Sequence, residues 1–369
     1  MRAIQCFSSV PLLQGRQASG LYVTQKDISL PRCVLLCMEL SALQWRRLNG
    51  PITLYTDTPM RNYLAEHHLL NCWDKVNTKV LDSFYRNCHS IDFKTFWSAG
   101  KFACYERERA PFVCIDTDLV VWKRLSFSSG IDFGFAHWER IEPEDESYPD
   151  LDQIQGPPGY EPFPRKCFAP LACNMAISYF GNDQFRKELA VQAMSFMKGN
   201  HLDPGTRYAV PEILYMEQRL PLAIAKRNGL TYAPVLECTW SPKNFRIVHP
   251  DNLTQNWFFS DLNTEKPFTH LWFHKKYLAE NEAENRRYCA ALKDKIHLAR
   301  EGLNAADKGK LPGNWNIYAG CNKWCSRCSN IVRPMTEDPD VPAELRSLTQ
   351  GRLLVFCQKY SNYTVTPPW

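Results

Sequence analysis

The chain has 369 residues and a net charge of only +5, because 44 Lys and Arg are nearly balanced by 39 Asp and Glu. Its basic residues are spread along the chain rather than grouped, which argues against a nucleic-acid partner. The length is sufficient for one large α/β core with a smaller appendage. No apolar run approaches the ~20 residues that a membrane-spanning helix requires.

The N-terminus and the cysteines indicate a cytoplasmic protein. Ser8, Ser9 and Pro11 interrupt the first apolar stretch too early for a secretory signal. Most of the 15 cysteines stand singly among apolar residues, as small buried side chains do in a reducing compartment.

Strands and helices are predicted to alternate in the first part of the chain. The apolar spacing predicts a strand over 3–7, a loop over 8–26, a helix over 32–48, a strand over 51–56, a helix over 60–70, a strand-like stretch over 76–81 followed by a polar connection, and a helix over 95–107. Such alternation predicts a Rossmann-like α/β fold, a mainly parallel sheet with helices on both faces.

Two carboxylates follow the next predicted strand. The apolar run from Phe112 to Ile115 predicts a buried strand, and Asp116 and Asp118 stand directly after it. Ligands of open α/β sheets bind at the carboxyl ends of the strands. Two carboxylates there can hold a hard divalent cation that carries phosphate oxygens. A solvated turn or a helix cap is the alternative interpretation of such a triplet.

This stretch, FVCIDTDLVVW (112–122), resembles the strand and Asp-x-Asp motif of glycosyltransferases with the type A fold, the nucleotide-diphospho-sugar transferases. The segment before it resembles a helix in poorly characterised bacterial proteins of that type. The resemblance implies a catalytic domain over 1–280 and leaves 281–369 as a helical, cysteine-containing extension. Within the domain, the acidic and proline-rich residues 139–164 are expected to form a surface loop without regular structure.

The resemblance also implies roles for residues on either side of the motif. Lys101 would reach the diphosphate, although a solvated helix lysine is the alternative. Asn174 would touch the donor sugar, but Met175 and Ala176 stand where the related motif has small residues or Gly. Glu217 would orient or deprotonate the acceptor hydroxyl, the alternative being a solvated helix face.

The segment THLWFHKK (269–276) resembles the downstream part of the same site. His270 would complete the coordination of a cation held by Asp116 and Asp118, and Lys275 or Lys276 would meet the diphosphate. A neutral imidazole suits Mn²⁺ beside carboxylates, and Lys neutralises the charge of the leaving group. The alternative for His270 is an ordinary core histidine.

Near the C-terminus, Cys321, Cys325 and Cys328 have the Cys-x3-Cys-x2-Cys spacing of radical S-adenosylmethionine enzymes. Only about forty residues follow, too few for the barrel of those enzymes. A Zn²⁺ site with a fourth ligand elsewhere, or three unligated thiols, are the two alternatives.

The expected function is a metal-dependent glycosyltransferase that uses Mn²⁺ or Mg²⁺ and a nucleotide-diphosphate sugar. Its acceptor would be a saccharide, a lipid-linked molecule or a protein. Two alternatives share the fold: a nucleotide-binding or scaffold protein without turnover, and a sugar-phosphate nucleotidyltransferase. The latter usually carries an N-terminal Gly-rich basic loop, of which only Gln14-Gly15-Arg16 is reminiscent.

Overall fold

The computed structural model describes residues 1–14, 23–24, 27–141, 148–161, 163–200, 210–241, 246–248, 260–272, 274–307, 332–334 and 355–357. The chain divides into two compact units, Met1–Arg300 and Glu301–Trp369. Within the second unit, strands β16 (Val332–Pro334) and β17 (Val355–Cys357) pair antiparallel. The first unit contains every residue of the candidate site described below.

A seven-stranded sheet forms the centre of the first unit, in the order β12-β8-β11-β6-β1-β4-β5. Its strands are β1 (Ala3–Cys6), β4 (Ile52–Tyr55), β5 (Lys75–Asn77), β6 (Phe112–Ile115), β8 (Phe133–Phe135), β11 (Ile177–Phe180) and β12 (Tyr232–Pro234). Within this sheet only β11 runs antiparallel to its neighbours. The prediction of a mainly parallel α/β sheet is therefore confirmed.

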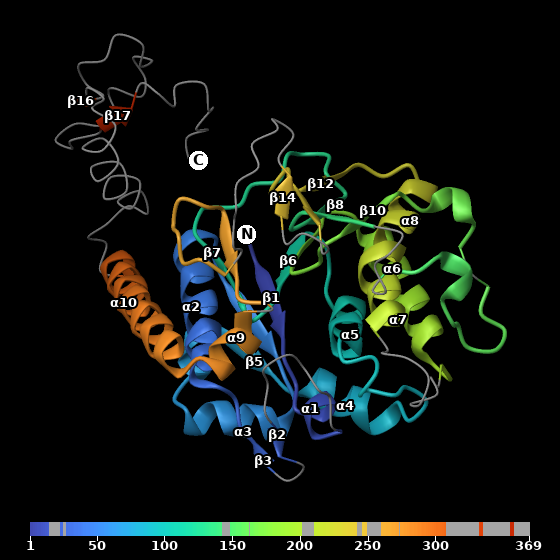
Figure 1. Ribbon diagram of the computed structural model, residues 1–369, viewed down its shortest axis with the longest axis horizontal. Coiled ribbons are helices and arrows are strands. Elements are labelled where there is room, and N and C mark those ends of the chain that lie inside the picture. Colours follow the sequence, from blue (N-terminus) through green and yellow to red (C-terminus); the bar gives the residue numbers. More distant parts are fainter. Residues whose placement is uncertain are drawn as a thin grey trace. The chain divides into compact units, whose positions relative to one another are not determined.

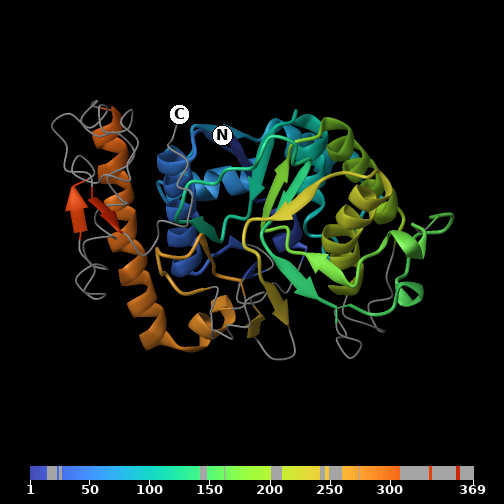
Figure 2. The same ribbon diagram turned by 90° about the horizontal axis from the view of Figure 1, so that it is seen from above.

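Helices cover both faces of this sheet, with α2 on one side of β1 and β6 and α5 on the other (Figures 1 and 2). The helices of this unit are α1 (Val10–Leu13), α2 (Arg32–Leu48), α3 (Thr58–Glu66), α4 (Lys79–Asn87), α5 (Ala99–Arg107), α6 (Asp183–Met197), α7 (Val210–Leu214), α8 (Leu220–Arg227), α9 (His274–Glu280) and α10 (Glu282–Asp307), which continues past Arg300. Successive residues of a strand point to opposite faces. On β1, Gln5 accordingly donates to Ser41 of α2 over 2.8 Å, whereas Ile4 joins the core beneath α5.

Three smaller sheets are described in this unit besides the central one. The shortest pairs β2 (Val23–Thr24) antiparallel with β3 (Asp27–Ile28), and the other two contain longer strands. The first has the order β10-β9-β13-β14, formed by β10 (Leu171–Cys173), β9 (Trp138–Arg140), β13 (Thr239–Ser241) and β14 (Arg246–Val248). The second is the antiparallel pair of β7 (Leu119–Val121) and β15 (Phe268–His270). No helix in the described ranges has both the length and the apolar character needed to cross a membrane.

Some predicted elements differ from those observed. The predicted loop over 8–26 contains helix α1, and the predicted strand over 76–81 ends at Asn77 because α4 begins at Lys79. The apolar side chains Val80, Leu81, Phe84 and Tyr85 have helical spacing, which outweighs the β-branched character of this short stretch.

Two short elements lie within residues 139–164, which were expected to form a loop without regular structure. Strand β9 includes Glu139 and pairs with β10, and a short 3₁₀ turn spans Leu151–Gln153. Glu139 is buried on that strand and accepts a hydrogen bond from Asn174. A charged residue in an acidic segment is expected to be exposed, so the sequence did not predict this burial.

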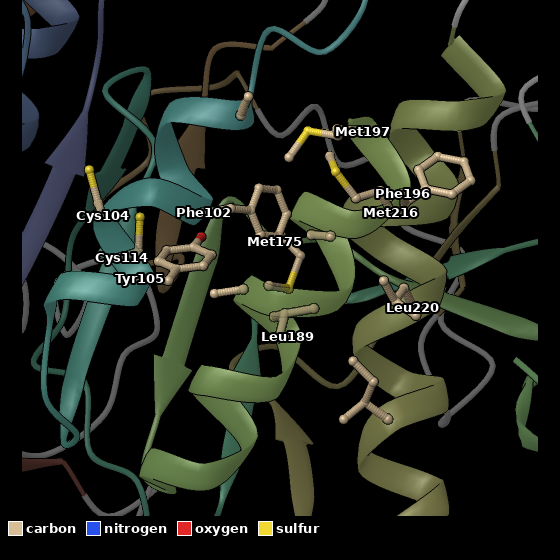
Figure 3. Close-up of a cluster of buried hydrophobic side chains, with 14 of the residues drawn as sticks. Phe102, Cys104, Tyr105, Cys114, Met175, Leu189, Phe196, Met197, Met216 and Leu220 are labelled. Carbon is tan, nitrogen blue, oxygen red and sulfur yellow. The ribbon is translucent and has the colours of Figure 1, made fainter. Parts of the chain in front are cut away.

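Aromatic and methionine side chains fill the core between α5, α6 and the helical segment 210–227. Figure 3 shows Phe102 and Tyr105 of α5 facing Leu189 and Phe196 of α6, with Met216 beside them. The same core extends onto the sheet through Phe180 of β11, whose ring centroid lies 4.9 Å from that of Phe112 and 4.6 Å from that of Tyr105.

We expect Phe180→Ala to lower the free energy of unfolding by about 3–5 kcal/mol, because it empties a fully buried aromatic position. Urea unfolding followed by tryptophan fluorescence measures this loss. Val191→Ala on α6 is the control, since Val191 is 62% exposed and its truncation should cost less than about 0.5 kcal/mol. Equal losses in the two variants would contradict this account of the core.

Candidate metal centre

The carboxyl end of β6 brings three predicted ligands together. Asp116 follows the strand directly, and its backbone N–H donates to the carbonyl of Ala176 over 2.8 Å. Strand β7 then begins at Leu119 and pairs with β15, opposing Leu119 to His270. Because the backbone N–H of Leu271 also donates to the carbonyl of Asp118 over 2.9 Å, His270 is held next to Asp118.

The three side chains fit a cation site. One ligand atom each from Asp116, Asp118 and His270 lies within 4.8 Å of the other two. Asp118 and His270 are buried and Asp116 is half-buried. His270 Nε2 lies 3.6 Å from Asp118 Oδ1. Two carboxylates and an imidazole are a suitable donor set for a divalent cation such as Mn²⁺.

Each aspartate is also paired with one lysine. Lys101 Nζ lies 2.6 Å from Asp116 Oδ1 and 2.7 Å from Glu217 Oε1. Lys275 Nζ lies 2.5 Å from Asp118 Oδ2. Lys275 thus takes the Asp118 oxygen that does not face His270. The lysines balance the negative charge of the two aspartates, and both aspartates still lie close to the imidazole of His270.

The pKa shifts agree with this pairing. Burial alone would raise the pKa of Asp118, but Lys275 and then His270 outweigh it and hold that pKa well below its usual range. Burial would lower the pKa of Lys101, but Asp116 and Glu217 reverse the effect and raise it well above the ordinary value. Asp118 and Lys101 are therefore both charged at neutral pH.

Glu217 reaches Lys101 from a π-helical turn. The helical segment 210–227 consists of α7, the π turn Tyr215–Arg219 and α8, and the N–H of Leu220 donates to the carbonyl of Tyr215. Pro221 explains this turn, because a proline has no N–H for the carbonyl of Glu217 four residues earlier and its ring clashes with that carbonyl in a regular α-helix. Single π turns of this kind occur frequently at functional sites.

Asn174 lies between β10 and β11, on the way to Asp116. Its Nδ2 donates to Glu139 Oε1 over 2.5 Å, and its Oδ1 accepts from the N–H of Ala176 over 3.0 Å. The side chain is buried, and both of these hydrogen bonds are to other parts of the protein. Its contact with a donor sugar stays a prediction.

The remaining predicted residues lie apart from this cluster. Lys276 is exposed, and within the described residues the structure records no ion pair between it and the acidic side chains of the site. The cysteines of the predicted Zn²⁺ site, Cys321, Cys325 and Cys328, lie outside the described residues.

Sequence reasoning gave no site role to Glu139 or Tyr148, two buried residues next to the site, and it placed the buried Gln218 near the site without assigning it a role. They come from β9, from the end of the acidic segment and from the π turn. None belongs to a spaced motif, so no pattern in the sequence connects them.

The fold and the site define an α/β protein with a candidate cation site at the carboxyl edge of a mainly parallel sheet. By sequence the chain belongs to a family of unknown function, DUF6734, whose family model matches residues 1–297. No curated protein matches the chain.

Three solved structures illustrate what the fold is similar to. Apo mouse xyloside xylosyltransferase 1 is 13% identical with a TM-score of 0.32, covering 65% of this chain and 86% of that one. The nucleoside-diphosphate-sugar pyrophosphorylase from Vibrio cholerae RC9 is 9% identical with a TM-score of 0.32, covering 68% and 97%. Galactosyltransferase LgtC, in complex with donor and acceptor sugar analogs, is 11% identical with a TM-score of 0.31, covering 63% and 73%.

Proposed function

We propose that the protein is a metal-dependent glycosyltransferase that moves a sugar from a nucleotide-diphosphate sugar to an acceptor. The observation that carries the proposal is the meeting of Asp116, Asp118 and His270, with Lys275 beside them, at one strand end. The resemblance of the segments 112–122 and 269–276 to type A glycosyltransferases gives the class of reaction.

The charges of the site favour a diphosphate once a cation is present. Asp116, Asp118 and Glu217 carry three negative charges, and Lys101 and Lys275 carry two positive ones. With a neutral imidazole the cluster has a net charge of about −1, and a divalent cation changes it to about +1. That excess of positive charge is complementary to an anionic donor.

Each residue then has a role in binding or orientation. Asp116 meets the nucleotide ribose and, with Asp118 and His270, holds Mn²⁺ or Mg²⁺. Such a cation neutralises the negative charge that develops on the departing diphosphate. Lys275 binds the same diphosphate as a hydrogen-bond donor, and we assign this role to it rather than to the exposed Lys276.

Two further residues bind the substrates, Asn174 the donor sugar and Glu217 the acceptor. The amide nitrogen of Asn174 has two N–H groups. One donates to Glu139, and the other donates to the donor sugar. Glu217, which is paired with Lys101, accepts a hydrogen bond from the acceptor hydroxyl and orients it.

A screen of nucleotide-sugars tests this proposal. We expect a UDP- or GDP-sugar to raise the melting temperature in the presence of Mn²⁺ and not in EDTA, because a ligand that binds only the folded state stabilises it. The best donor is then incubated with the protein and Mn²⁺, with and without saccharide, lipid-linked and peptide acceptors.

The products distinguish the three functions that share this fold. Release of a nucleoside diphosphate with transfer or hydrolysis of the sugar supports the glycosyltransferase. A sugar 1-phosphate that forms only when pyrophosphate is added identifies a nucleotidyltransferase instead. Stabilisation without any product identifies a nucleotide-binding protein, and no stabilisation by any nucleotide-sugar overturns the proposal altogether.

A further inference from the structure

A buried carboxylate stands behind the candidate site. Glu139 on β9 is 2% exposed, and it accepts hydrogen bonds from Asn174 Nδ2 over 2.5 Å and from the Tyr148 hydroxyl. Burying a carboxylate is costly unless it is hydrogen-bonded. These contacts explain how the protein tolerates Glu139, and they connect it to two routes that both lead to Asp116.

The first route runs through the backbone. Asn174, held by Glu139, uses its Oδ1 to accept from the N–H of Ala176 over 3.0 Å. The carbonyl of Ala176 in turn accepts from the N–H of Asp116 over 2.8 Å. Glu139 thus fixes the turn before β11, and this turn holds the backbone of Asp116.

The second route runs through side chains. The Tyr148 hydroxyl also contacts Gln218 Oε1, and both residues are buried. Gln218 follows Glu217 in the π turn, and Glu217 accepts from Lys101 over 2.7 Å. Lys101 then pairs with Asp116 Oδ1 over 2.6 Å. Tyr148 thereby connects Glu139 to the side chain of the same aspartate.

We propose that Glu139 and Tyr148 are positioning residues for the metal centre, which set the orientation of Asp116 from its backbone and from its side chain. The inference rests on the proposed function only in taking Asp116 as a cation ligand. Partners behind the ligands commonly affect metal affinity 10–100-fold, because they fix the orientation of the ligating atoms.

The test combines a metal-free and a metal-dependent measurement on the full chain. Hydrogen exchange, read by mass spectrometry without metal, should be faster at the Asp116 amide in Glu139→Ala than in the wild type. Electron paramagnetic resonance of free Mn²⁺ should show an affinity for the ion that is about 10-fold or more weaker in the same variant. Glu139→Gln keeps an acceptor oxygen for Asn174. Its exchange rate at the Asp116 amide and its Mn²⁺ affinity should therefore both stay close to the wild-type values.

Two comparisons separate positioning from simple destabilisation. Glu212 is a buried glutamate outside these routes, and Glu212→Ala should leave both measurements near the wild-type values even where it lowers the melting temperature. Tyr148→Phe keeps the aromatic ring and should weaken Mn²⁺ binding in the wild-type background. In a Lys101→Met background the same substitution should have no further effect, because Tyr148 acts through Lys101.

The proposal is overturned if Glu139→Ala and Tyr148→Phe fold and neither the exchange of the Asp116 amide nor the Mn²⁺ affinity changes. It is equally overturned if Glu212→Ala alters both to the same degree as Glu139→Ala. A wild-type protein that binds no Mn²⁺ contradicts the proposed function, while the exchange of the Asp116 amide still decides whether Glu139 positions that residue.

Discussion

Asp118→Asn is expected to abolish Mn²⁺ binding and metal-dependent turnover of a nucleotide-sugar, with a loss of about 100-fold or more in each. The substitution preserves size but removes the negative charge from a buried side chain that faces both His270 and Lys275. Titration of Mn²⁺ by electron paramagnetic resonance and an assay of nucleoside diphosphate release measure the two losses.

Asp152→Asn is the matched control for this change. Asp152 is an exposed carboxylate that pairs with Arg165 on the surface, so its neutralisation should leave both measurements unchanged. Thermal unfolding of the two variants checks that each is folded. Full metal binding and turnover in a folded Asp118→Asn variant would remove the basis of the proposed function.

Lys275→Met is expected to have opposite effects on the cation and on the diphosphate. Loss of the ammonium group leaves Asp118 buried without its closest positive partner, which should lower stability without metal by about 3 kcal/mol. The same loss removes repulsion toward a cation, so Mn²⁺ alone should bind more tightly and restore stability. UDP or GDP should bind about 10-fold or more weakly in Mn²⁺, because a charged hydrogen-bond donor is missing.

Isothermal titration with Mn²⁺, and then with nucleotide in excess Mn²⁺, measures the two affinities separately. Lys276→Met removes the same charge from the next position of α9, where the side chain is exposed, and should change neither affinity by more than about 2-fold. Equal effects of the two substitutions, or weaker Mn²⁺ binding in Lys275→Met, would contradict the charge balance proposed for the site.

The main features of the fold follow from local patterns that the sequence displays. Helix α2 occupies the predicted residues 32–48, because its apolar spacing is regular and Asn49-Gly50 provides a stop. Strand β6 also matches its prediction, as a short apolar run after a proline. Helix α4 was not predicted, because the β-branched residues Val76, Thr78 and Val80 lie just before it or in its first turn, and this suggested a strand.

The three candidate metal ligands could be predicted from the sequence, whereas the contacts of their neighbours could not. Asp116 and Asp118 stand one residue apart after a buried strand, and His270 lies in a segment that resembles a known motif. The ion pair of Lys101 with Glu217 and the buried contacts of Glu139 join residues that are distant in sequence. Such contacts arise from tertiary packing, which single-sequence periodicity does not encode.

The central claim is that Asp116, Asp118 and His270 bind one divalent cation, and pulsed electron paramagnetic resonance of the Mn²⁺-loaded protein tests it most directly. An imidazole nitrogen bound to Mn²⁺ modulates the electron spin echo. We predict this modulation in the wild type and in His67→Gln, where an exposed histidine is changed, and its loss in His270→Gln. Absence of nitrogen modulation in the wild type, or its persistence in His270→Gln, would contradict the claim.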